Sequence, residues 1–236
     1  MIINMWSGPR NISSALMRSF ENRKDTEVID EPFYAYYLQK TGLKHPMYEK
    51  IIETYETDLN KIIKRLTIPN QKNYFIKNMT HHMLENISLD WIRKTKNFFL
   101  IRHPNKVIKS YIKKNSLINS SDLGYPEQLK IYKYVKSNST KEIIVVNSDK
   151  LLDNPKKIIR KLCNKLDINF ELNMLEWPKG KRNTDGIWST VLYNNVINST
   201  NFYKDNKVEK LKFLNKYNDI YDECFEIYNE LNKYSI

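Results

Sequence analysis

Chemically useful side chains come together near the beginning of the chain. A turn signal, a cation and small polar residues occur in the run Gly8-Pro9-Arg10-Asn11-Ile12-Ser13-Ser14. This run follows a short apolar segment and precedes apolar residues at helical spacing, so it joins a buried strand to a helix. Such a junction directs free backbone N–H groups and the positive end of a helix at one point, where Arg10 adds a full charge. The residues predict a binding site for a phosphate or sulfate group.

A second cation occupies a similar place later in the chain. Arg102 follows the apolar segment 97–101, and Pro104 then begins a pattern of helical spacing that carries Ser110. Ligands of open α/β sheets bind outside the carboxyl ends of the strands. Arg102 therefore lies where a bound anion is expected.

Two further groups could accept a proton during a reaction. Glu31 follows the segment 26–29, and the proline after it favours an extended backbone at Glu31. His81 and His82 follow another apolar segment, and a neutral imidazole suits proton transfer near pH 7. Glu31 is the first candidate for the general base, and His81, with His82 beside it, is the second.

Neither of two common nucleotide-binding loops is present around Arg10. The Walker A loop requires a second glycine followed by Lys and then Ser or Thr, and the dinucleotide fingerprint requires several closely spaced glycines. Gly8 is the only glycine of this run. The pattern therefore disfavours an ordinary ATPase, GTPase or metal-dependent P-loop kinase.

Short apolar segments alternate with helical patterns along the chain, which is typical of a parallel sheet with helices on both faces. We expect a single domain over 1–236 because a length of 236 residues suits one α/β unit. The expected fold is a three-layer α/β/α arrangement with a mostly parallel sheet, and the amphipathic segment 206–236 should pack as a helix. The expected strands are 2–6, 26–29, 73–77, 97–101 and 142–146.

The run from Pro9 to Ser14 resembles the 5′-phosphosulfate loop of sulfotransferases, P-[KR]-S-G-[ST]-[ST], with Asn11 in place of Ser and Ile12 in place of Gly. Arg102 and Ser110 resemble the family pattern strand–R-[ND]-P…S. Segments 147–155 and 177–188 resemble later family segments in the same order. The resemblance implies a P-loop NTPase-like fold and an enzyme that uses 3′-phosphoadenosine 5′-phosphosulfate (PAPS) and releases 3′,5′-ADP.

The resemblance also implies roles for individual residues. The 5′-phosphosulfate would be held by Pro9, Arg10, Asn11, Ile12, Ser13 and Ser14. Arg102 and Ser110 would hold the 3′-phosphate, and a loop of Lys179, Gly180 and Lys181 would cover it. Arg10 would stabilise the negative charge that develops on the leaving phosphate.

Two family elements bear on the general base. Glu31 resembles the base of members that carry an E-P element. Lys77 matches the first residue of a K-T-H element whose histidine is the base in other members, but here Asn78 and Met79 displace the histidine to His81 or His82. The implied catalytic residues are Arg10, Glu31, Lys77 and His81.

Composition narrows the range of partners. The net charge is +12, but Lys is spread evenly along the predicted helices, and no arginine-rich run with interleaved aromatic residues marks a nucleic-acid groove. No apolar run has the length of a membrane-spanning helix, and the chain begins directly in a strand. We therefore expect a cytoplasmic protein with reduced, buried Cys163 and Cys224 that binds neither nucleic acid nor membranes.

The sequence thus predicts a sulfotransferase that moves a sulfuryl group from PAPS to a hydroxyl or amine of a small-molecule or sugar acceptor, by in-line transfer and with no metal required. Segment 34–66, between the second and third strands, is expected to cover the acceptor. Three alternatives are a P-loop kinase-like phosphotransferase, a nucleotide-binding protein without catalysis, and a basic binding module.

Overall fold

The computed structural model describes residues 1–69, 71–140, 142–203 and 215–236. Within these residues, five strands form one sheet in the order β2-β3-β1-β4-β5, and every adjacent pair is parallel. The strands are β1 (Ile2–Ser7), β2 (Thr26–Asp30), β3 (Asn73–Met79), β4 (Lys96–Ile101) and β5 (Ile144–Asn147). The predicted α/β fold is confirmed, and the observed strand bounds differ from the expected ones by at most two residues at either end.

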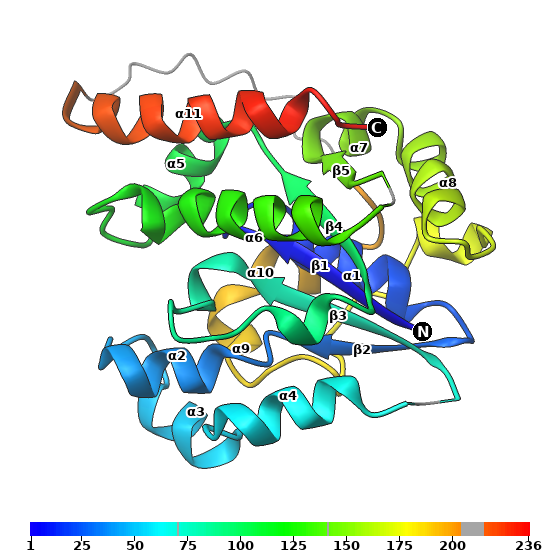
Figure 1. Cartoon of the computed structure of the whole chain (residues 1–236), viewed down its shortest axis with the longest axis horizontal. Coiled ribbons are helices and arrows are strands. Elements are labelled where there is room, and N and C mark those ends of the chain that lie inside the picture. Colours follow the sequence, from blue (N-terminus) through cyan, green and yellow to red (C-terminus); the bar gives the residue numbers. More distant parts are fainter. Residues whose placement is uncertain (70, 141, 204–214) are drawn as a thin grey trace.

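Helices cover both faces of the sheet, as Figure 1 shows. One face packs against α1 (Ser13–Glu21), α3 (Tyr48–Thr54), α7 (Ser148–Asp153) and α8 (Pro155–Lys165). The other packs against α4 (Leu59–Thr67), α5 (Pro104–Ile112), α6 (Tyr125–Asn138) and α11 (Asn218–Asn232). Helix α2 (Tyr34–Thr41) contributes to both cores, and the short helices α9 (Ser189–Leu192) and α10 (Asn194–Ile197) lie on the face of α1.

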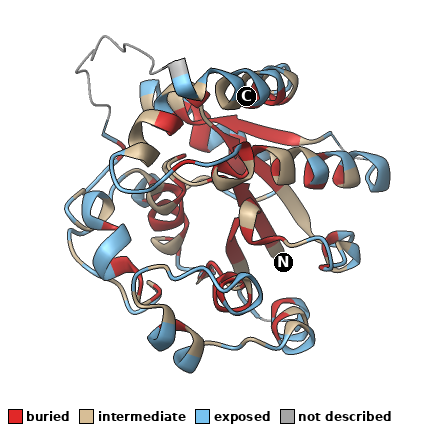
Figure 2. Cartoon of the chain, turned by 90° about the vertical axis from the view of Figure 1, so that its left-hand side faces the viewer, coloured by how far each residue is buried: buried red, intermediate tan, exposed pale blue. Residues whose placement is uncertain are grey.

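The two cores follow from the alternation of side chains along each strand. In β4, Phe98 and Leu100 enter the core beneath α1, whereas Phe99 and Ile101 enter the core beneath α6. All four side chains are fully buried, as expected for a strand covered on both sides. Figure 2 shows the buried strands at the centre and exposed surface on the outer sides of the helices.

The strand order decides where a ligand can bind. The chain leaves β1 through α1 on one face of the sheet, and it leaves the neighbouring β4 through α5 on the other face. The loops after these two strands therefore diverge, and such a divergence opens a crevice at the carboxyl edge of an α/β sheet. Arg10 and Arg102 come from these two loops.

The remaining expectations concern the cysteines and the C-terminal region. Cys163 and Cys224 are free thiols buried in separate cores, in agreement with the prediction. The helix expected over 206–236 is represented by α11, and residues 206–214 lie outside the described part of the chain. Among the helices that the structure describes, none combines the length and the apolar character needed to cross a membrane.

Candidate active site

Residues 8–14, which we call the anion loop, connect β1 to α1 with an unusual backbone. Arg10 and Ile12 have left-handed conformations, with φ angles of 64° and 62°. Gly8 is required by close packing, because a Cβ there would lie 2.2 Å from the backbone oxygen of Leu123. Ile12 thus keeps a conformation that favours glycine, at the position where the sulfotransferase pattern carries one.

The last residues of the anion loop form the N-terminus of α1, which has no side-chain cap. Ile12 is the N-cap residue, and its carbonyl accepts hydrogen bonds from the N–H groups of Ala15 and Leu16. Ser13 and Ser14 form the first turn. Backbone N–H groups of an uncapped first turn remain available to an anion.

Asn11 connects the anion loop to the core by hydrogen bonds. It is almost fully buried, its Nδ2 donates to the carbonyl of Leu100 in β4 at 3.3 Å, and its own carbonyl accepts a hydrogen bond from Ser148 Oγ at 2.8 Å. These bonds tie the loop to β4 and α7. The expected role of Asn11 in binding the phosphosulfate stays a prediction, and its Oδ1 is buried without a hydrogen-bond partner among the described residues.

The two predicted arginines and Ser110 meet beside this loop. Arg10 Nε donates to Ser110 Oγ at 2.7 Å, and Arg102 Nη1 donates to the carbonyl of Arg10 at 3.0 Å. Burial, together with the neighbouring Arg102 charge, lowers the pKa of Arg10. Arg102 Nε is buried and makes no hydrogen bond within the described residues, although Asp149 lies 3.7 Å away. Two adjacent cations with unused hydrogen-bonding capacity form a site for an anion.

Glu31 and Lys77 lie in a second cluster, at the ends of β2 and β3. The register pairs Asp30 with Lys77, and the N–H of Glu31 donates to the carbonyl of Lys77 at 2.9 Å. Lys77 Nζ donates to Asp30 Oδ1 at 2.9 Å and also to Glu31 Oε1. The side chain of Glu31 is 8% exposed and that of Lys77 is 1% exposed, so the pair is almost shielded from water.

Burial and charge act in opposite directions in this cluster. Burial raises the pKa of Asp30, and the Lys77 ammonium opposes that rise. Burial disfavours the ammonium of Lys77, but the carboxylates of Asp30 and Glu31 outweigh that effect and raise its pKa. Lys77 therefore stays charged and holds both carboxylates. Asp30, which was not among the predicted site residues, could have been suspected because it directly precedes Glu31.

The histidine pair lies in an aromatic cluster on α2. The ring of His82 stacks on Tyr34 at a centroid distance of 4.7 Å and on Tyr37 at 4.8 Å, and the ring of His81 is 4.2 Å from that of His82. Burial, followed by the neighbouring charges, lowers the pKa of both histidines well below the usual value. Both imidazoles are therefore neutral at pH 7. Helix α2, the first element of segment 34–66, packs directly over them.

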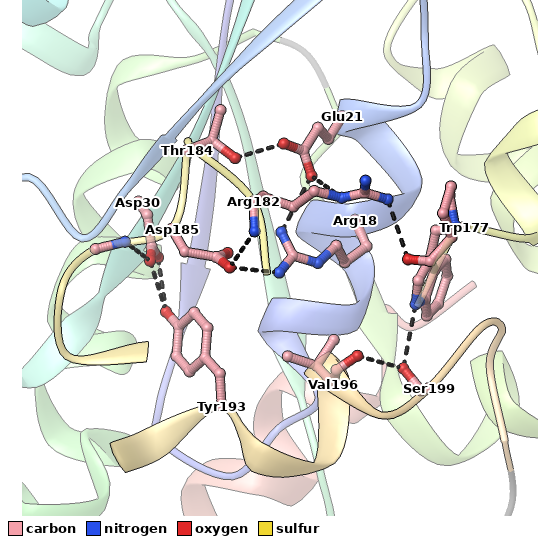
Figure 3. Close-up of polar contacts among 12 residues, drawn as sticks. Arg18, Glu21, Asp30, Trp177, Arg182, Thr184, Asp185, Tyr193, Val196 and Ser199 are labelled. Atoms are coloured by element: carbon pink, nitrogen blue, oxygen red, sulfur yellow. Dashed lines mark hydrogen bonds and ion pairs between the residues drawn. The ribbon is translucent and has the colours of Figure 1, made fainter. Parts of the chain in front are cut away.

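The segment 177–188 lies along the C-terminal half of α1 rather than at its N-terminus, as Figure 3 shows. Arg182 Nε is 3.6 Å from Glu21 Oε2, and the N–H of Gly180 donates to the carbonyl of Ile197 at 2.9 Å. Lys179 and Lys181 are exposed. Within the described residues, no hydrogen bond or ion pair joins 179–182 to Arg10, Arg102 or Ser110. The expected role of Lys179, Gly180 and Lys181 as a cover for the anion stays a prediction.

No group of three or more His, Cys, Asp or Glu side chains that could hold a metal ion occurs among the residues that the structure describes.

A surface hollow of about 560 Å³ lies at the opposite edge of the sheet, where Met1 and Asn73 mark the amino ends of β1 and β3. Ligands of parallel sheets bind at the carboxyl edge, so the two clusters described above form the candidate active site.

Comparison with known proteins identifies the family and the fold of the chain. A family profile described as a sulfotransferase domain matches residues 1–230. The sulfotransferase domain of the Synechococcus PCC 7002 olefin synthase has a similar fold, with a TM-score of 0.63, 14% identity, and coverage of 98% of this chain and 94% of that one. The sulfotransferase domain of the curacin biosynthetic pathway gives a TM-score of 0.53 at 15% identity, covering 100% and 91%.

A curated relative extends the comparison to plants. The chain is 33% identical over 232 residues to "Branched-chain-amino-acid aminotransferase-like protein 2" of Arabidopsis thaliana. The match covers 98% of this chain and 41% of the relative, so the chain spans about two fifths of that protein's length.

Proposed function

Since this chain belongs to the sulfotransferase domain family, we propose that it transfers a sulfuryl group from PAPS to a hydroxyl or amine of a small-molecule or sugar acceptor. The observation that carries the proposal is the meeting of Arg10, Arg102 and Ser110 beside the N-terminus of α1. These residues are distant in the sequence, and two of them are cations placed side by side. An anionic donor would relieve the repulsion between the two guanidinium groups and would accept hydrogen bonds from their remaining N–H groups.

The anion loop and α1 would hold the 5′-phosphosulfate, and Arg102 with Ser110 would hold the 3′-phosphate. PAPS supplies the sulfuryl group and a phosphate leaving group. Negative charge grows on that phosphate during transfer, so a cation fixed beside it acts most strongly in the transition state. Arg10 is the residue proposed for this role, because its Nε is anchored on Ser110 and its guanidinium is partly desolvated.

Glu31 is the proposed general base. Its Oε1 accepts hydrogen bonds from the protein, whereas Oε2 accepts none within the described residues and is available for the proton of the acceptor. His81 is the second candidate, and burial lowers its pKa and so weakens it as a base. Segment 34–66 is the proposed acceptor cover, because α2 packs over the histidines that follow β3.

Thermal unfolding with 3′,5′-ADP, PAPS or ATP–Mg²⁺ tests the donor site. A ligand at 100 times its Kd adds about 2.7 kcal/mol, which raises the Tm of a domain of this size by about 5–10 °C. We expect this rise with 3′,5′-ADP and PAPS in the wild type and no rise in Arg102→Ala. Arg160→Ala is the matched control, because it removes an arginine of α8 that lies over the ring of Phe170.

A rise in Tm with ATP–Mg²⁺ alone would favour a kinase-like enzyme, and no rise in Tm with any ligand would contradict the proposed donor site.

The general base is tested separately by sulfuryl transfer from labelled PAPS to acceptor mixtures. We expect Glu31→Gln to lower kcat by about 10²–10⁴-fold and His81→Gln to lower it much less. The opposite ranking would assign the base to His81.

A further inference from the structure

Tyr193, which lies between α9 and α10, reaches into the cluster of Asp30, Glu31 and Lys77. Its side chain is buried, and its hydroxyl lies 2.8 Å from each carboxylate oxygen of Asp30 and 3.1 Å from Glu31 Oε1. The hydroxyl also accepts a hydrogen bond from Lys77 Nζ. Nothing in the local sequence around Tyr193 predicted this contact.

The hydrogen-bond donors of this cluster can be matched to their acceptors one by one. An ammonium group has three protons to donate, and Lys77 directs them to Asp30, Glu31 and Tyr193. A phenol has one proton, and the hydroxyl of Tyr193 is closer to Asp30 than to Glu31. Burial and then the nearby carboxylates raise the pKa of Tyr193 well above its usual value, so the phenol keeps that proton. Both carboxylate oxygens of Asp30 thereby have donors, and of the two carboxylates in this cluster only Glu31 retains an oxygen without a partner among the described residues.

The chain around Tyr193 is itself held in place at several points. The N–H of Gly186 donates to Asp30 Oδ2 at 3.2 Å, and Asp185 accepts a hydrogen bond from Arg18 of α1 at 2.6 Å (Figure 3). A Cβ on Gly186 would lie 2.1 Å from the ring of Trp188, so glycine is needed for Trp188 to pack here. Residues 185–193 therefore connect α1, which begins at the anion loop, with the carboxylate at the end of β2.

We infer that Tyr193 is a positioning residue. Its hydroxyl donates to Asp30, so the Lys77 ammonium stays bound to Glu31. Lys77 then holds Glu31 in one orientation, with Oε2 directed at the acceptor. The inference rests on the proposed function with Glu31 as the base. If the phenol hydroxyl is removed, one proton of Lys77 loses its acceptor and Asp30 loses a donor. The ammonium is then free to shift toward Asp30, and Glu31 gains other orientations.

Steady-state kinetics of Tyr193→Phe tests the inference, with Tyr228→Phe as the matched control. Tyr228 is also buried and accepts one hydrogen bond, from Asn147 Nδ2 at 2.9 Å, but it lies in the core on the other face of the sheet. We expect kcat of Tyr193→Phe to fall by about tenfold to a hundredfold, with the KM for PAPS changed less than twofold. Tyr228→Phe should keep both constants within twofold of the wild type.

Asp30→Asn provides a second variant, because it removes the charged partner of Tyr193 without changing the shape of the side chain. It should lower kcat less than Tyr193→Phe does, at constant KM for PAPS, because a neutral amide at position 30 no longer draws the Lys77 ammonium away from Glu31. Amide hydrogen exchange of the ligand-free protein adds a readout that needs no turnover. We expect faster exchange at Gly186 in Tyr193→Phe, because the carboxylate that its N–H contacts is then less firmly held.

Four results would overturn the inference. Equal kcat values for Tyr193→Phe and Tyr228→Phe in an active enzyme would overturn it alone, as would unchanged exchange at Gly186. A wild-type protein that binds 3′,5′-ADP but transfers no sulfuryl group to any acceptor would overturn the proposed function together with it. If the KM for PAPS of Tyr193→Phe rose by the same factor as kcat fell, Tyr193 would act on the donor site instead.

Discussion

Ile12 adopts a backbone conformation that its β-branched side chain disfavours. A β-branched residue in the left-handed region is rare, and the strain is of order 1–3 kcal/mol. The surrounding structure compensates, because the carbonyl of Ile12 begins the hydrogen bonding of α1 and its side chain packs against the core. The loop therefore keeps a left-handed backbone at a β-branched residue, at a cost in stability.

Two substitutions at Ile12 isolate this strain. Ile12→Gly and Ile12→Ala both remove the side chain beyond Cβ, so they differ mainly in tolerance of a left-handed φ. We expect Ile12→Gly to be more stable than Ile12→Ala by about 1 kcal/mol, measured by chemical denaturation.

The reverse order is expected in the body of α1, where glycine is disfavoured. Ala15→Gly should lose about 1 kcal/mol relative to the wild type. Equal stability of the two Ile12 variants would mean that the loop does not hold a left-handed backbone in solution.

Among the secondary-structure elements, α1 has two functions. Its N-terminus contributes to the anion site, and its C-terminal half anchors the segment 177–199. The anchor is a buried ion pair, since the side chains of Arg18 and Asp185 are 1% and 2% exposed. Glu21 extends it, because its carboxylate pairs with both Arg18 and Arg182. A buried pair of this kind specifies one placement of the segment, because either charge alone would be costly to bury.

Asp185→Asn tests this anchor. Loss of one charge leaves Arg18 buried with a weaker partner, and we expect destabilisation of about 3 kcal/mol, a fall in Tm of about 6–12 °C. Glu49→Gln is the control, because it breaks an ion pair with Lys44 whose side chains are 66% and 74% exposed. The control should leave Tm unchanged. Similar Tm values for the two variants would show that the buried pair does not fix the segment.

For the molecule as a whole, buried titratable groups make stability depend on pH. The pKa values of His81 and His82 are lowered well below 6.5 in the folded protein because burial disfavours the charged imidazole. The unfolded chain therefore binds more protons than the folded one below about pH 6.5. The stability that the histidines contribute is present above that pH and is lost as pH falls. The raised pKa of Asp30 acts in the opposite sense, because there the folded state binds the additional proton.

The expected outcome is a Tm that falls between pH 7 and pH 5, with a slope reduced in His82→Gln. One buried histidine accounts for up to about 1.4 kcal/mol per pH unit in the interval between its two pKa values. His103→Gln should reduce the slope less, because His103 is half-buried and its pKa is lowered by a smaller extent. Parallel Tm curves for the wild type and His82→Gln would exclude a buried neutral His82.

Much of the site could be predicted from local patterns. The strands are apolar runs, and the cations that follow them lie at the carboxyl edge because parallel strands all end there. Arg10 and Arg102 were identified in this way and Ser110 through the resemblance to the sulfotransferase pattern, and the structure joins the three by hydrogen bonds. Glu31 was identified separately as a residue at a strand end, and Lys77 through its match to the K-T-H element of the family. Their direct contact required the register of β2 against β3.

The sequence by itself determined the order of elements and the residues at the strand ends, because burial and hydrogen bonding impose their periodicity over a few neighbouring residues. Only the tertiary structure decided that Tyr193 reaches Asp30 and that 177–188 lies against Arg18 and Glu21. A glycine flanked by lysines at 179–181 has the composition of an anion cover wherever it lies. Its position depends on a buried ion pair and a glycine contact between distant segments, which no local pattern encodes.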